Sequence, residues 1–107
     1  MDREPAFAGR FYPSDGRELD AQVSGFIGPS PNQRNAVAVV APHAGYKYSG
    51  AIAGQVFADV RVPSTAIILG PNHTGAGARA AIMTRGTWLL PGRRIPIDAG
   101  VAEDLRR

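Results

Sequence analysis

The chain has two histidines, His43 and His73, and each follows an apolar run that ends in a proline. Imidazole nitrogen is a ligand of zinc, iron and copper, and it exchanges protons near neutral pH. The apolar runs, residues 36–41 and 65–70, have the composition of strands that are covered on both faces. Because the carboxyl ends of two parallel strands meet at one edge of a sheet, we expect the two histidines to converge on a shared pocket.

Two histidines do not complete a metal site. Zinc commonly takes three or four protein ligands, and non-haem iron often takes two histidines with one carboxylate. Cysteine is absent, so a third donor from this chain would be a carboxylate. Several acidic residues are candidates, and no spacing singles one out: Asp15, Asp59, Asp98, Glu103 and Asp104. Spacing alone leaves two alternatives open, a shared site and two unrelated loop histidines.

Two helices are expected to flank the central part of the chain. Residues 13–27 carry an apolar stripe at helical spacing, and Asp15 with Glu18 forms a capping-box pattern at the start. Near the end, Asp98 is placed to cap a last helix, and the sequence stops after about two turns of that helix. We therefore expect residues 1–107 to be one incomplete domain.

The central part predicts strand, helix, strand. The strand at 36–41 leads into a loop at 43–50, a helix follows at about 52–60, and the second strand is 65–70. A third strand is expected at 80–84, and residues 88–97 suit a loop or short strand. A right-handed crossover makes the first two strands parallel. The predicted class is α/β: a layered sheet with a parallel strand-helix-strand core and helices on both faces.

Composition excludes several classes of function. The net charge is +3 and no basic cluster is interleaved with aromatic residues, so we expect no nucleic-acid partner. No apolar run approaches the roughly 20 residues that span a bilayer, and the start does not resemble a signal peptide, so a cytoplasmic protein without membrane contact is expected. The glycine-rich stretch 70–77 lacks the lysine and Ser/Thr of a phosphate-binding loop.

Four sequence blocks resemble the Memo family. They are PHAGYKYSG (Pro42 to Gly50), LGPNHT (Leu69 to Thr74), AGRFYP (Ala8 to Pro13) and the tract from Trp88 to Asp98. Their order and spacing agree with a Memo-like protein of the AmmeMemoRadiSam group over essentially the whole chain. Members are well over twice as long, so the resemblance implies that residues 1–107 are the N-terminal part of a Memo-like α/β domain. Their fold is similar to that of class III extradiol dioxygenases, which use non-haem iron.

The resemblance implies roles for particular residues. His43 and His73 match the two histidine metal ligands of the family, and Tyr48 matches a pocket tyrosine. Phe11 stands where the family often has tryptophan. Together with Tyr46, and with Asn72 of the second block, these aromatic residues are the expected lining of the pocket. The family's third ligand, a cysteine in Memo proteins and a glutamate in the dioxygenases, has no counterpart here. The tract Leu89 to Gly92 departs from the family's usual sequence, which puts its loop geometry in question.

Three hypotheses about function follow. The first is a metal-pocket protein of redox or oxygenase type that is inactive in isolation, with Fe(II) as the expected ion and Cu or Zn as alternatives. Whether the chain is an enzyme stays open. The second is a peptide- or protein-binding module that uses the same pocket, and the family implies radical-SAM and AMMECR-type partner proteins. The third is a remnant that self-associates through an exposed sheet edge.

Overall fold

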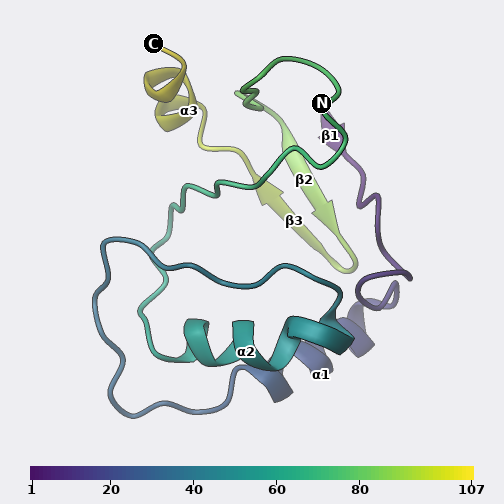
Figure 1. Ribbon diagram of the computed structural model, residues 1–107, viewed down its shortest axis with the longest axis vertical. Coiled ribbons are helices and arrows are strands. Elements are labelled where there is room, and N and C mark those ends of the chain that lie inside the picture. Colours follow the sequence, from purple (N-terminus) through teal and green to yellow (C-terminus); the bar gives the residue numbers. More distant parts are fainter.

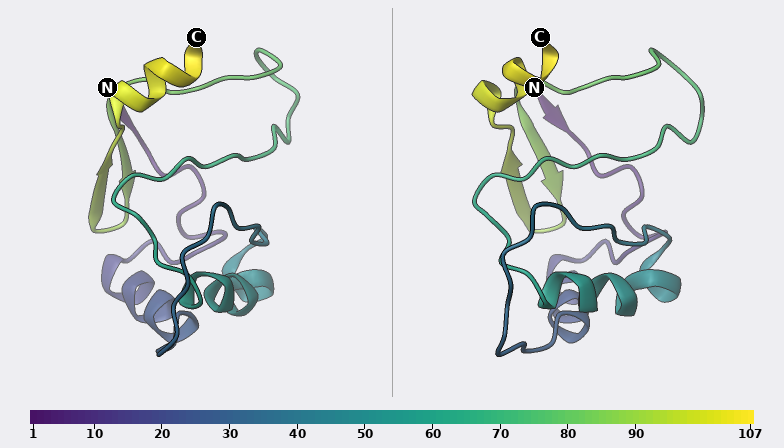
Figure 2. Two further views of the ribbon diagram at one scale, coloured as in Figure 1. Left: turned by 90° about the vertical axis from the view of Figure 1, so that its left-hand side faces the viewer. Right: turned by 60° about the vertical axis from the view of Figure 1, so that its left-hand side comes forward.

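The computed structural model describes all residues from 1 to 107 and forms a small α/β domain with three helices and a three-stranded mixed sheet (Figure 1). The helices α1 and α2 lie together at one end of the molecule, α3 lies at the other, and the sheet is between them (Figure 2). The predicted α/β class is confirmed. The elements in chain order are β1 (Asp2–Arg3), α1 (Gly16–Phe26), α2 (Tyr46–Ala58), β2 (Thr87–Leu90), β3 (Arg93–Pro96) and α3 (Ala99–Arg106).

The starts of α1 and α3 are set by capping aspartates, as their sequences predicted. Asp15 accepts a hydrogen bond from the Glu18 amide at 3.0 Å, and Asp98 accepts one from the Val101 amide at 3.1 Å. Each bond satisfies one of the amide donors that a first helical turn leaves without a partner. Asp98 also accepts a bond from the Thr65 hydroxyl at 3.1 Å, which ties the start of α3 to a distant segment.

The central helix α2 begins six residues earlier than its apolar pattern predicted. Residues 46–50, expected in a loop, form its first turns, and Gly45 is the residue before the helix. The Ser49 hydroxyl donates to the Ala44 carbonyl at 2.8 Å, and the amide of Tyr46 donates to the Phe11 carbonyl at 2.7 Å. These bonds hold the start of the helix against the N-terminal segment. The apolar stripe used for the prediction marks only the later turns.

Helices α1 and α2 pack through one aromatic ring and two glycines. A Cβ added at Gly50 would lie 2.6 Å from the ring of Phe26, and one added at Gly54 would meet the Phe26 carbonyl group. Bare glycine backbone therefore allows the close approach of the two helices. Leu19 and Ala58 are among the few buried residues, so the core is small.

The sheet has the order β1-β2-β3, with β1 parallel to β2 and β2 antiparallel to β3. The hairpin between β2 and β3 pairs Leu90 with Arg93 across the two-residue turn Pro91-Gly92. Gly92 has φ +76°, the left-handed conformation that a type II turn needs at its second central residue. The sequence predicted a loop or a short strand in this tract. The structure has two short strands, because Pro91-Gly92 forms a tight turn that joins them in a hairpin.

The predicted parallel strand-helix-strand core is wrong for this structure. Residues 36–41, 65–70 and 80–84 form no strand, and the first two segments make no backbone-to-backbone hydrogen bond. The helices also lie at the ends of the sheet and not on both of its faces. A strand needs a neighbouring strand to pair with on at least one side. The apolar composition of residues 36–41 and 65–70 is typical of buried strands, but in this structure most of these residues are exposed.

None of the three helices has the length and apolar character needed to cross a lipid bilayer.

Candidate functional site

The two histidines meet. His43 Nε2 and His73 Nε2 are 3.1 Å apart, within hydrogen-bond distance, with one nitrogen donating and the other accepting. The ring centroids are 5.2 Å apart and the ring planes are inclined by 40°. Both residues are exposed. The convergence expected from two adjacent strands therefore occurs, although the segments that lead to the histidines are not paired as strands.

The loop that carries His73 is shaped by Asn72. The Asn72 side-chain oxygen accepts bonds from the amides of Thr74 and Gly75, at 3.2 and 3.0 Å. Its side-chain nitrogen donates to the Ala76 carbonyl at 2.8 Å. Such a side chain substitutes for backbone partners in a turn. Asn72, expected to line the pocket, is thus engaged within its own loop, where it fixes the path of the chain after His73.

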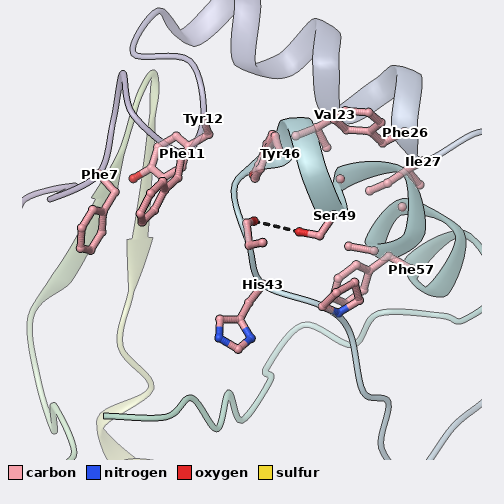
Figure 3. A pocket seen from close by; sticks show the side chains of 15 residues that line it. Phe7, Phe11, Tyr12, Val23, Phe26, Ile27, His43, Tyr46, Ser49 and Phe57 are labelled. Atoms are coloured by element: carbon pink, nitrogen blue, oxygen red, sulfur yellow. Dashed lines mark hydrogen bonds between the residues drawn. The ribbon is translucent and has the colours of Figure 1, made fainter. Parts of the chain in front are cut away.

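A cavity of about 510 Å³ opens beside His43, between the N-terminal segment and the two packed helices. Figure 3 shows Phe7 and Phe11 on one side of it and Phe26 and Phe57 on the other, with His43 at the edge between them. Ten of the fifteen lining residues are hydrophobic, which is typical of a small-molecule or peptide pocket. The full lining is Phe7, Phe11, Tyr12, Val23, Phe26, Ile27, Pro42, His43, Ala44, Tyr46, Ser49, Gly50, Ala53, Gly54 and Phe57.

Aromatic rings on the N-terminal segment form a stacked wall at this cavity. Phe7 and Phe11 stack with centroids 4.8 Å apart and planes 15° from parallel. The guanidinium of Arg10 lies 6.0 and 5.7 Å from the two ring centroids, a cation–π arrangement. The wall presents an apolar face to the cavity and carries a positive charge beside it.

The phenol of Tyr46 is partly buried at the cavity. Burial raises the pKa of its phenol above the usual 10.0, and the nearby Tyr12 phenol raises it further. The Tyr46 ring lies 5.7 Å from that of Tyr12 and 6.1 Å from that of Phe26, between centroids. Tyr46 is therefore a neutral phenol that can donate a hydrogen bond at the cavity over the physiological pH range.

The expected pocket residues are divided by the structure. Phe11, His43 and Tyr46 line the cavity, whereas Tyr48 is 78% exposed and is not one of the lining residues. His73 is outside the lining and reaches the site through His43. Three further lining residues, Phe7, Tyr12 and Phe57, were not predicted from the sequence. Tyr12 could have been found, because it lies next to Phe11 in the AGRFYP block.

No third protein ligand stands beside the histidine pair. No group of three or more His, Cys, Asp or Glu side chains is close enough together to hold a metal ion. Two of the acidic candidates have other roles, since Asp15 and Asp98 cap helices. The structure thus offers two imidazole nitrogens, one neutral phenol and an apolar cavity.

These features describe an α/β protein with a paired-histidine site beside an aromatic pocket. The chain belongs to the Memo-like protein family, whose model matches residues 3–107. It is 42% identical to a MEMO1 family protein of Methanopyrus kandleri, over 100% of this chain and 42% of the relative. It is 41% identical to one of Thermococcus kodakarensis, over 100% and 38%, and 42% identical to one of Thermotoga neapolitana, over 98% and 43%. No solved structure matches it.

The chain spans about two fifths of the length of these curated relatives.

Proposed function

We propose that this chain provides the two-histidine part of a metal pocket in the Memo family, with His43 and His73 as ligands of one divalent ion. The observation that carries the proposal is the 3.1 Å distance between His43 Nε2 and His73 Nε2. Neighbouring imidazole ligands of one ion place their nitrogens at about 2.0–2.1 Å from it, and angles of about 90–110° at the metal then separate them by roughly 2.8–3.4 Å. The observed separation falls within that range.

The residues present fit such an ion only in part. Imidazole suits Zn, Cu and Fe, and the expected ion is Fe(II), with Cu and Zn as alternatives. The other coordination positions would belong to water or to donors outside these residues, because the structure places no carboxylate with the pair. With two protein ligands, the chain alone is expected to bind metal weakly and to lack catalysis.

The chain's own residues would then have distinct tasks. His43 and His73 would hold the ion through Nε2 as neutral imidazoles, so the ring that donates the hydrogen bond between the two Nε2 atoms would carry its proton on Nδ1 instead. The stacked Phe7 and Phe11 rings would give a flat apolar surface to a substrate. The Tyr46 phenol, whose pKa is raised by burial, would donate a hydrogen bond to a polar atom of a ligand in the cavity. When bound, Fe(II) supplies the redox chemistry of an oxygenase-type site.

Metal titration tests this function. Calorimetry with Fe(II) under anaerobic conditions, and with Zn(II) and Cu(II), should give one ion per chain. His43→Ala and His73→Ala each remove a metal ligand. Loss of a residue that only hydrogen-bonds to a ligand lowers metal affinity by roughly 10- to 100-fold, so each of these substitutions should lower it further. Arg79→Ala, in the same exposed loop region as His73, is the control and should bind as the original chain does. Equal affinity in all four proteins would contradict the proposal.

The second candidate is a peptide- or protein-binding module, and the hydrophobic lining of the 510 Å³ cavity favours it. Radical-SAM and AMMECR-type proteins, which the family resemblance implies, are the partners to test. Binding that survives chelation of metal and both histidine substitutions, but is lost in Phe11→Ala, would support this function. Binding that needs the histidines and metal would favour the first.

A further inference from the structure

Ser49 is the one polar residue that the fold buries, with 7% of its surface exposed. It lies in the first turns of α2, and its hydroxyl donates to the Ala44 carbonyl at 2.8 Å (Figure 3). A serine hydroxyl inside a helix usually donates to the carbonyl three or four residues back, within the same helix. The Ser49 hydroxyl reaches one residue further, past Gly45, and so ties the helix to the segment that precedes it.

This bond acts directly beside His43, because Ala44 is the next residue. Apart from it, the main chain of residues 36–44 makes no hydrogen bond. The backbone that carries His43 is therefore tied to a regular element of the fold by the hydroxyl of one buried side chain.

The segment that carries His73 has no such tie of its own. The bonds that Asn72 makes stay within the loop 72–76. Between residues 66 and 82, the one hydrogen bond that leaves this loop is the bond between the His73 and His43 rings. The His73 ring is thus placed through the His43 ring, and the His43 backbone is placed through α2.

The structure assigns Ser49 as a positioning residue for the two histidines: its hydroxyl fixes the peptide group after His43 and thereby keeps the two Nε2 atoms 3.1 Å apart. Ser49 makes no hydrogen bond to either imidazole ring, so it acts on them through Ala44. Where the inference concerns metal affinity it rests on the proposed function, whereas the placement of the rings can be measured without metal.

Removing the hydroxyl should displace the histidines without unfolding the chain. Ala44 is exposed, so water can replace the hydroxyl as the partner of its carbonyl. Alanine is also the strongest helix former, and Ser49→Ala should keep the circular dichroism of the original chain. A serine with a merely structural role would lower stability when replaced and would leave the rings together.

Proton NMR of the metal-free chain reads the placement of the rings. A cross-ring nuclear Overhauser effect between His43 and His73 should be present in the original chain and lost in Ser49→Ala. The chain has only these two histidines, so His43→Ala and His73→Ala assign their signals.

A matched pair of variants separates the hydroxyl from the shape of the side chain. Ser49→Thr keeps the donor and should retain the cross-ring signal, whereas Ser49→Val has nearly the same shape without the donor and should lose it. Because Ser49 lines the cavity, the additional methyl group can lie toward open space. Asp15→Ala is the control for stability, since it removes a capping bond of α1 and should retain the signal.

Zinc titration of the same proteins gives a second measurement. Ser49→Ala and Ser49→Val should weaken Zn(II) binding about tenfold, at the lower end of what the loss of a residue behind a metal ligand costs. Ser49→Thr and Asp15→Ala should bind Zn(II) as the original chain does.

The NMR result decides the inference. A cross-ring signal that persists in Ser49→Ala and Ser49→Val would overturn it, as would an absent signal in the original chain or its loss in Asp15→Ala. Loss confined to the variants without the hydroxyl, in a chain that binds no zinc, would support the positioning role and contradict the metal function. Failure of the inference and failure of the proposed function are therefore distinguishable.

Discussion

The backbone carbonyl and the Cβ of Phe26, at the end of α1, lie directly against Gly54 of α2, where no additional Cβ can be accommodated. Together with Gly50, this contact sets the spacing of the helix pair that forms one wall of the aromatic cavity. A glycine in mid-helix lowers helix propensity, so its presence here is explained by packing and not by local structure.

Gly54→Ala should therefore destabilise the protein. The added methyl group would meet the Phe26 backbone, and overpacking of this kind costs about 1–3 kcal/mol. Gly25→Ala is the control, because no atom lies within 4 Å of the position that a Cβ would take there. That substitution should be neutral or should stabilise by up to about 1 kcal/mol. Urea unfolding of both variants measures the difference, and similar stabilities would refute the close approach of the helices.

Asp15→Ala should weaken α1 at its start. The Asp15 carboxylate accepts the Glu18 amide bond at 3.0 Å, and loss of such a cap costs about 0.5–2 kcal/mol. Asp15→Ser keeps an acceptor at the same position and should stay within a few tenths of a kcal/mol of the original chain. The free energy of unfolding gives the comparison. Equal losses in the two variants would show that the capping bond is not the source of the effect.

The raised pKa of Tyr46 predicts a loss of stability in alkali. Folding favours the protonated phenol, so the unfolded chain releases this proton at lower pH than the folded chain does. The stabilising contribution is complete below the usual pKa of 10.0 and is lost as pH rises through the raised folded pKa. Urea unfolding measured from neutral to alkaline pH should show this decline in the original chain.

Tyr46→Phe removes the titrating group and should flatten that part of the pH dependence. Tyr48→Phe is the matched control, since Tyr48 is 78% exposed and removal of its hydroxyl should leave the decline in place. An identical alkaline decline in the original chain and in Tyr46→Phe would mean that another group carries the effect.

The family and the proximity of the two histidines were predictable from the sequence, whereas the start of α2 was not. The block PHAGYKYSG and its partner LGPNHT identified the Memo family, which the match over residues 3–107 confirms. The prediction that His43 and His73 lie together agrees with their 3.1 Å separation, whereas their role as metal ligands stays a prediction. The start of α2 was missed, because the bonds that hold it come from Phe11 and Ala44 and not from its apolar pattern.

The sequence by itself determined what depends on neighbouring residues: the capped starts of α1 and α3 and the apolar stripe of α1. A capping bond spans three residues, so the pattern and the structure that it makes lie in the same short stretch. The tertiary structure alone decided what residues 36–41 and 65–70 become. A strand exists only with a partner, and among these 107 residues both segments remain unpaired while the histidines that follow them still meet.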